Sequence, residues 1–141
     1  MTYRIGITGS TGSLGQVILK KFKKFRIKRF KGDVRNRKDV FNWVLRNKIE
    51  IIIHLAAVVP IKIVNQNKKK ALEINFVGTK NVVDASIKKN VKWFFFSSTS
   101  HVYKYSFAKI SERSKKYPVS YYGKTKLLAE NYIRKQLDKS G

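Results

Sequence analysis

Two side chains near the end of the 141-residue chain, Tyr122 and Lys126, have the types and spacing of an acid–base pair. Positions four apart on a helix project from one face, so a helix here would bring the phenol and the ammonium together. An ordinary tyrosine has a pKa of about 10, and a neighbouring ammonium favours the phenolate and lowers that pKa. We therefore predict a redox Tyr-x-x-x-Lys pair with a lowered Tyr122 pKa. Tyr121 is five positions from Lys126, which turns it off that face.

A glycine-rich turn near the start, residues 9–15 (GSTGSLG), lies between an apolar run and an amphipathic segment. Gly9 permits a tight turn, Gly12 lets backbone N–H groups approach a pyrophosphate, and Gly15 lets a helix pack closely on a strand. The N-terminus of the following helix adds a partial positive charge. The turn predicts a dinucleotide cradle, and a glycine turn that binds no ligand is the alternative. No Gly-Lys-Ser/Thr stands at the Walker A position, which excludes that phosphate loop.

Apolar periodicity predicts the elements that must position these motifs. Apolar runs predict strands over residues 3–8, 26–30, 49–55 and 91–97. Repeats of three and four residues predict helices after the glycine turn, after a cap formed by Asn36 and Asp39, over about 69–89 and over about 120–137. This order indicates an α/β fold, a doubly wound parallel sheet of the Rossmann type with about five strands and flanking helices. We expect one domain, residues 1–141.

Two apolar segments are expected to be buried. The run Trp93 to Phe96 is too apolar to be left in water, so we expect it deep in the sheet. The helix after the glycine turn is expected to pack through an apolar face. That face consists of Leu14, Val17, Ile18, Phe22 and Phe25.

The charge of the chain is strongly positive, with 32 Lys and Arg against eight Asp and Glu, a net +24. Eight of the twelve residues from 20 to 31 are basic, and such a surface attracts polyanions. The alternative is a lysine-rich proteome with solvated helix faces, so we expect only nonspecific nucleic-acid binding. With no Cys, two His and no clustered carboxylates, we expect no metal site. The chain shows no signal-peptide pattern or membrane-length apolar run, so we expect a cytoplasmic protein without a membrane partner.

Four further motifs stand in order after the glycine turn, and a fifth contains the tyrosine. They are residues 32–35 (GDVR), 54–57 (HLAA), 75–81 (NFVGTKN), 97–103 (SSTSHVY) and 122–126 (YGKTK). Together with the glycine turn they resemble, over nearly the whole chain, the extended short-chain dehydrogenase/reductase family, which includes NAD(P)-dependent nucleotide-sugar epimerases, dehydratases and reductases. The resemblance implies a set of cofactor-binding residues: Gly9, Thr11, Gly12, Ser13, Leu14, Gly15, Asp33, Val34, Leu55, Ala56, Ala57, Asn75 and Lys126.

The resemblance also implies a mechanism, hydride transfer between nicotinamide C4 and a sugar carbon. By register, the catalytic Ser or Thr of the family falls on Thr99, which would hold the sugar oxygen. Tyr122 would exchange the proton on that oxygen, and Lys126 would bond the nicotinamide ribose. Where family dehydratases carry an Asp-Glu pair this chain has Ser100 and His101, which argues against a 4,6-dehydratase. We interpret His101 as a bystander, or else as a residue that faces the substrate.

The choice between NAD and NADP depends on a short connection. Only 18 positions separate Gly15 from Asp33, and the family's ribose-binding carboxylate has no clear counterpart. Asp33 would bind the ribose, or Arg29 and Lys31 would pair with a 2′-phosphate. We therefore predict that the chain binds NADP, or both NAD and NADP.

The family resemblance also implies what the chain lacks. Relatives continue with another strand and a region that binds the nucleotide sugar, so we expect the strand over 91–97 to be a sheet edge. The isolated chain is then expected to self-associate or to need a complementary polypeptide, and a homodimer through helices 69–89 and 120–137 is a further expectation. We interpret the chain as the cofactor-binding half of a nucleotide-sugar oxidoreductase or epimerase. The alternatives are a non-catalytic NAD(P)-binding module and a basic nucleic-acid-binding protein that reuses the fold.

Overall fold

The computed structural model describes residues 3–59 and 61–138 of the domain predicted over 1–141. Residues 1, 2, 60 and 139–141 lie outside the described residues. The described residues build one parallel sheet, with strand order β2-β1-β3-β4. Its strands are β1 (Arg4–Thr8), β2 (Arg26–Arg29), β3 (Ile51–His54) and β4 (Trp93–Phe96). Each strand falls in its predicted range, and the sheet has four described strands where about five were expected. The doubly wound Rossmann-like fold is confirmed.

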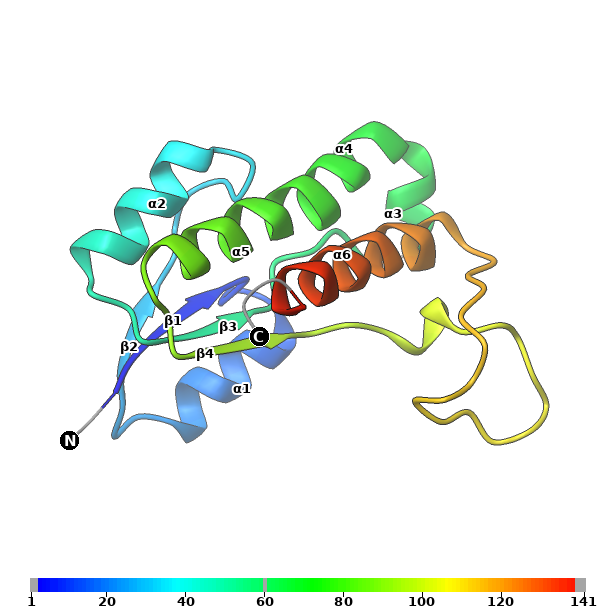
Figure 1. Cartoon of the computed structure of the whole chain (residues 1–141), viewed down its shortest axis with the longest axis horizontal. Helices are drawn as coiled ribbons and strands as arrows, with labels where there is room; N and C mark the ends of the chain where they lie inside the picture. The colour runs from blue at the N-terminus through cyan, green and yellow to red at the C-terminus, as the bar shows by residue number, and fades with distance from the viewer. Residues whose placement is uncertain (1–2, 60, 139–141) are drawn as a thin grey trace.

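Helices cover the two faces of the sheet unequally (Figure 1). Helix α1 (Ser13–Lys21) connects β1 to β2 on one face, while α2 (Arg37–Arg46) and α5 (Thr79–Lys88) lie on the other. The chain runs outward from β1 to β2 and then crosses back to β3, so the order of strands reverses between β1 and β3. In open α/β sheets a ligand site forms at such a switch point, outside the carboxyl ends of the strands.

The segment predicted as one helix over 69–89 is divided into three parts. It consists of α4 (Lys68–Leu72), a π-helix (Glu73–Gly78) and α5, and it is preceded by the unpredicted helix α3 (Ile61–Gln66). A π-helical turn is rare and often lies at a functional site, because it changes which side chains share a face. Asn75 is in this turn and is completely buried.

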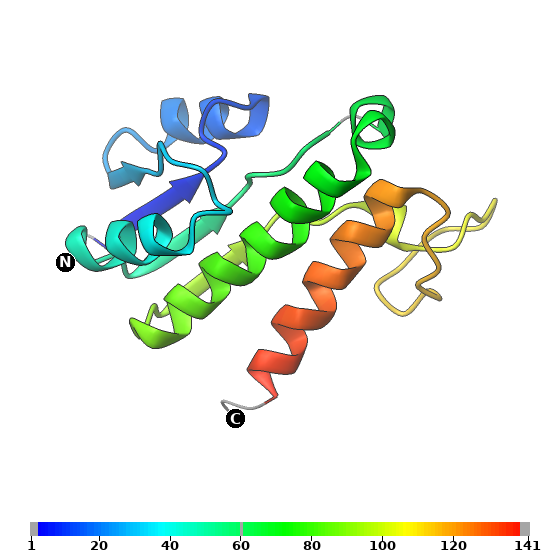
Figure 2. The ribbon, with the colours of Figure 1, turned by 90° about the horizontal axis from the view of Figure 1, so that it is seen from above.

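Two of the predicted helices, α2 and α6 (Tyr121–Leu137), begin at a side-chain cap. The Asn36 side chain accepts from the Asp39 N–H at 3.2 Å and begins α2 as predicted. Ser120 accepts from the Gly123 N–H at 3.0 Å and begins α6, which runs beside α5 in the same layer (Figure 2). Between β4 and α6 the chain forms a short 3-10 helix (Ser100–Val102) and a long loop.

The core lies between the sheet and the α2/α5 layer. Its buried members include Val40, Val44, Ile52, Val82 and Ala85, supplied by α2, β3 and α5. At one end the rings of Phe30 and Trp43 extend it, with centroids 5.1 Å apart.

The two other apolar segments are not buried as predicted. On α1 and just after it, four side chains that were predicted to form a buried face are exposed. They are Leu14, Val17, Phe22 and Phe25. On β4, Trp93 is 72% exposed and Phe95 51% exposed. The physical reason is the same in both places, because α1 is the one described helix on that side of the sheet and it lies on the β1/β2 side, away from β4 (Figure 2). The edge position expected for β4 is found, since β3 is the one described strand with which it pairs.

No helix among the described residues is both long enough and apolar enough to cross a membrane.

Candidate cofactor site and catalytic residues

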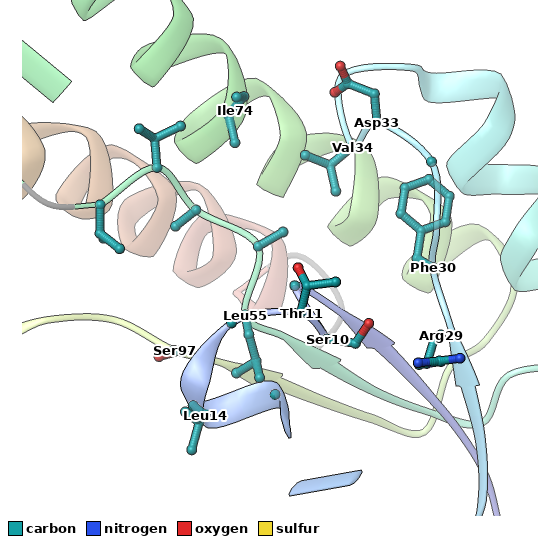
Figure 3. A pocket seen from close by; sticks show the side chains of 18 of the residues that line it. Ser10, Thr11, Leu14, Arg29, Phe30, Asp33, Val34, Leu55, Ile74 and Ser97 are labelled. Carbon is teal, nitrogen blue, oxygen red and sulfur yellow. The ribbon is translucent and has the colours of Figure 1, made fainter. Parts of the chain in front are cut away.

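A cavity of about 1000 Å³ lies at the carboxyl ends of the strands, where the order of strands reverses. Its walls come from segments far apart in the chain: residues 9–15, 29–35 and 55–59, then Lys70, Ile74, Ser97, Tyr122 and Lys126. In Figure 3 the side chains of Thr11, Val34 and Leu55, from three of these segments, surround one space. All the predicted cofactor-binding residues except Asn75 line this cavity.

The glycine turn has the geometry of a phosphate cradle. Gly9 has a φ of +68°, and a Cβ there would lie 2.6 Å from the Ala56 nitrogen, so only glycine fits. A Cβ on Gly15 would lie 2.5 Å from the Gly9 carbonyl oxygen, which explains the close approach of α1 to the turn. At Gly12 a Cβ would make only an ordinary contact, 3.5 Å from the Gly9 carbonyl oxygen, and this residue is the N-cap of α1 without a side-chain cap. The first N–H groups of α1 are therefore directed at a site where an anion would be stabilised.

Positive charge dominates the part of the cavity that follows β2. Arg29, Lys31 and Lys70 line it, and Asp33 is the one acidic residue among the described residues in its wall. The Asp33 carboxylate accepts from Arg35 Nη2 at 2.6 Å, and these hydrogen bonds lower the pKa of Asp33. Asp33 is thus ionised and already paired. A ligand that carries a further phosphate meets an excess of cations here.

The end of β3 provides the wall between the cradle and the catalytic helix. Leu55, Ala56 and Ala57 line the cavity as predicted. Asn75 lies behind them, where its Oδ1 accepts from the Val58 N–H at 2.7 Å and its Nδ2 donates to the Val58 carbonyl at 3.3 Å. The structure therefore places Asn75 as a support for the cavity wall rather than as part of it.

Helix α6 brings Tyr122 and Lys126 to the same cavity as the glycine turn. Lys126 is 3% exposed, and its Nζ lies 4.1 Å from the centre of the Phe96 ring. Burial lowers the pKa of Lys126 to about 8, and the negative charge of Glu130 opposes that shift. Lys126 therefore titrates much nearer to neutral pH than an ordinary lysine.

The predicted lowering of the Tyr122 pKa is wrong for this structure. Burial of the phenol raises its pKa, and the opposing influence is a hydrogen bond with the side chain of Thr99. Desolvation penalises a phenolate, and here it outweighs the influence of Thr99. At neutral pH Tyr122 is a phenol with a proton to give.

Thr99 reaches Tyr122 from the segment after β4. Its side chain caps the 3-10 helix by accepting from the His101 N–H at 3.2 Å, and it lies close enough to the Tyr122 phenol to lower the pKa of that phenol. The His101 ring meets the Tyr122 ring edge-on, with centroids 6.0 Å apart. The three predicted catalytic residues are thus brought together, although Thr99 is not in the cavity wall. Tyr121 instead lies under the Lys68 ammonium, 5.7 Å from its ring centre.

Several residues of the cavity wall were missed by sequence reasoning. They are Ser10, Phe30, Gly32, Arg35, Val58, Val59, Lys70, Ile74 and Ser97. The pair Lys70 and Ile74 was detectable, because positions four apart on the helical segment before Asn75 share a face. Ser97 directly follows β4, so the strand-end rule used for Leu55 also applied to it.

Among residues 3–59 and 61–138, no group of three or more His, Cys, Asp or Glu side chains is arranged to hold a metal ion.

Known proteins resemble the chain in sequence and in fold. The bifunctional UDP-glucose 4-epimerase and UDP-xylose 4-epimerase 1 of Pisum sativum is 32% identical over 105 residues, 73% of this chain and 30% of that protein. The dTDP-4-dehydrorhamnose reductase of Bacillus anthracis, solved in complex with NADP, is 27% identical with a TM-score of 0.89, covering 96% of this chain and 50% of that one. The UDP-glucose 4-epimerase of Thermus thermophilus, solved with NAD, has a TM-score of 0.88 at 19% identity, which shows the fold alone, and covers 96% and 51%. The chain therefore spans about half the length of these solved relatives.

One family profile matches almost the whole sequence. The match covers residues 5–141 and so includes the glycine turn, the strand-end motif at Leu55 and the pair on α6. The structure places these same segments around one cavity. The predicted resemblance is confirmed, and the chain belongs to the NAD dependent epimerase/dehydratase family.

Proposed function

We propose that this chain is the cofactor-binding and catalytic part of an NAD(P)-dependent enzyme that acts on a nucleotide sugar, as an oxidoreductase or an epimerase. The observation that carries the proposal is that Tyr122 and Lys126 share a cavity with the glycine turn, while Thr99 lies close enough to the Tyr122 phenol to lower its pKa. The similar Pisum sativum and Bacillus anthracis proteins are named for nucleotide-sugar reactions, which supports the substrate class.

The chemistry follows from the protonation states of the three residues. A bound nicotinamide supplies or accepts the hydride at the sugar carbon. In the direction of reduction, Tyr122 gives its proton to the carbonyl oxygen, and the raised pKa keeps that proton available at neutral pH. The Thr99 hydroxyl holds the same oxygen, and the Lys126 cation in the wall of the same cavity stabilises the phenolate that Tyr122 becomes. Oxidation reverses each step.

The first test is turnover of UDP- and dTDP-sugars with either nicotinamide, measured for Tyr122→Phe in the presence of a complementary polypeptide that contacts the sugar. Loss of a general acid of this kind costs about 10²- to 10⁴-fold in rate, while the ring and its packing are retained. Tyr121→Phe is the matched control, because its ring faces Lys68 and lies outside the cavity wall, so its rate should stay within about twofold. Saturable binding of nicotinamide without turnover would favour the non-catalytic module, and salt-sensitive DNA binding that persists in saturating dinucleotide would favour the nucleic-acid alternative.

For the cofactor we propose NADP or dual use. Arg29 and Lys31 line the cavity after β2, and Asp33 is engaged by Arg35. Binding of NADPH and NADH is compared in Arg29→Ala and in Arg26→Ala, a basic residue at the far end of β2 that does not line the cavity. The proposal expects Arg29→Ala to weaken NADPH by roughly tenfold and to leave NADH nearly unchanged, as loss of one charge-assisted phosphate contact would do. Equal losses for both nucleotides would contradict it.

We propose further that contacts to the sugar come from polypeptide beyond the residues described, because the chain spans half of its solved relatives. A homodimer through residues 69–89 and 120–137 is also a proposal, supported by exposed apolar side chains at Val77 and Leu128 on these helices. The cytoplasmic setting stays a prediction.

A further inference from the structure

The buried histidine His54 has no place in the chemistry above, yet both of its ring nitrogens are hydrogen-bonded. It is 1% exposed and does not line the cavity. Its Nδ1 lies 2.6 Å from the Thr8 hydroxyl and its Nε2 lies 2.9 Å from the Thr79 hydroxyl. The imidazole therefore joins the end of β1 to the start of α5.

The direction of each hydrogen bond follows from the partners. The Thr79 hydroxyl donates its single proton to the Asn75 carbonyl at 2.7 Å, so it accepts from His54 and Nε2 must carry a hydrogen. In a neutral ring Nδ1 is then the acceptor, and the Thr8 hydroxyl donates to it. Thr8 in turn accepts from the Ala56 N–H at 3.2 Å. Burial and the charge of Lys126 lower the pKa of His54 to about 3, which agrees with a neutral ring.

The hydrogen-bonded chain links the cavity wall to the catalytic helix. At one end it holds the Ala56 backbone, and at the other Asn75 holds the Val58 backbone. The Asn75 amide also donates to the Thr125 hydroxyl at 3.1 Å, and Thr125 donates to the Tyr122 carbonyl at 2.8 Å. Segment 55–58 and the first turn of α6 thus depend on one network.

Packing alone does not account for this choice of residues. The side chains of Thr8, His54, Asn75, Thr79 and Thr125 are all buried, and a buried polar group is costly unless its hydrogen bonds are made. Apolar residues would fill the same volume without that requirement. A fully satisfied network instead fixes one arrangement of the backbone, which a cofactor wall and an acid–base pair both need.

We infer that His54, as a neutral Nε2–H imidazole bridging Thr8 and Thr79, is a positioning residue that fixes the cavity wall at 55–58 against the helix that carries Tyr122. A role of His54 in catalysis rests on the proposed function, whereas its hydrogen bonds to Thr8 and Thr79 do not. The conservative variant His54→Gln keeps one donor and one acceptor, while His54→Phe keeps the ring shape and removes both.

The ring state is tested by nitrogen-15 NMR of the imidazoles. The chain has two histidines, so the variant His101→Gln leaves His54 as the single signal. We expect an Nε2–H tautomer that does not titrate between about pH 5 and pH 8. An Nδ1–H tautomer, or a midpoint near the ordinary value, would overturn the inference.

The positioning role is tested by amide hydrogen exchange in Thr79→Val, with Thr79→Ser as the control that keeps the hydroxyl. We expect the Val58 N–H to exchange at least about tenfold faster in Thr79→Val, while the core amides of Ile52 and Val82 keep their rates. His54→Phe should behave like Thr79→Val, and His54→Gln should restore most of the protection. A uniform rise at all amides, or no change at Val58, would show that the network only stabilises the fold.

Function is measured separately on the same variants. We expect Thr79→Val to weaken NADPH binding by roughly tenfold and Thr79→Ser to stay within about twofold. Unchanged NADPH binding in a Thr79→Val protein whose Val58 is unprotected would overturn the link to the cofactor site. Absence of sugar turnover by the unsubstituted chain together with a complementary polypeptide that contacts the sugar would instead count against the proposed function and leave the exchange and NMR results intact.

Discussion

The two faces of the sheet differ in how completely helices cover them. On the α2/α5 face, Ile52, Val40 and Val82 are fully buried, and α6 extends the same layer (Figure 1). On the α1 face, Trp93 and Phe95 of β4 are largely exposed. Alternate residues of one strand point to opposite faces, so Phe94 packs against the core while its two neighbours do not.

This difference shows which side of the molecule organises the site. The residues that position the catalytic pair, His54, Asn75 and Thr125, are all in the well-covered layer or at its border with the sheet. The shape of the glycine turn is fixed by backbone atoms that lie close to Gly9 and Gly15, and it does not depend on a helix layer over the α1 face. A complete cavity therefore exists although one face of the sheet is poorly covered.

The largest expected effect compares equivalent truncations on the two faces. Ile52→Ala removes a fully buried side chain and should lower the free energy of unfolding by about 2–5 kcal/mol. Phe95→Ala removes a larger side chain that is half exposed, and should cost less than about 1 kcal/mol. Urea unfolding at neutral pH measures both. If Phe95→Ala destabilises the protein as much as Ile52→Ala does, the two faces are equivalent and the comparison fails.

The sequence allowed the strands, the cap at Asn36 and the glycine turn to be predicted, because each is determined by neighbouring residues. It did not allow the burial of α1 or β4 to be predicted. An apolar pattern shows which face of an element can pack, but it does not show whether another element covers that face. The π-helix around Asn75 was also missed, since a single wider turn hardly changes the apolar spacing.

For the candidate site, the sequence predicted which residues come together better than it predicted their pKa values. Tyr122 and Lys126 do share the cavity, as the four-residue spacing predicted. The direction of the Tyr122 pKa was wrong, because desolvation depends on tertiary burial that spacing does not describe. The role of His54 depends on contacts with Thr8 and Thr79, which are 46 and 25 residues away.

The second prediction concerns the buried cation in the well-covered layer. The pKa of Lys126 falls from 10.5 to about 8 on folding, so below pH 8 the folded protein carries a charge that burial penalises. The unfolded chain binds this proton more readily between those two values, so stability rises as pH rises from about 8 to about 10.5. Lys126→Met should remove that rise and stabilise the protein at neutral pH by up to about 3 kcal/mol, while abolishing turnover.

Lys124→Met is the matched control, because Lys124 is an exposed lysine on the same helix. It should change the free energy of unfolding by less than about 0.5 kcal/mol at either pH. Urea unfolding at pH 7 and pH 10, about the two ends of the range, gives the comparison. Parallel pH dependence in the unsubstituted protein and in Lys126→Met would mean that folding does not penalise the cation.

The double variant Trp93→Lys with Phe95→Lys tests the α1 face most directly. It is expected to have the smallest effect on the free energy of unfolding. Both side chains are exposed on the edge strand β4, so the change in unfolding free energy should stay below about 1 kcal/mol. Charges on an exposed edge prevent strand pairing between copies, so the apparent mass in light scattering should become independent of concentration. Phe107→Lys is the control, because that ring is 96% exposed on the loop before α6, away from β4, and should leave association unchanged. If the double variant associates as the unsubstituted chain does, the contact between copies lies elsewhere, and the helices over 69–89 and 120–137 become the next surface to substitute.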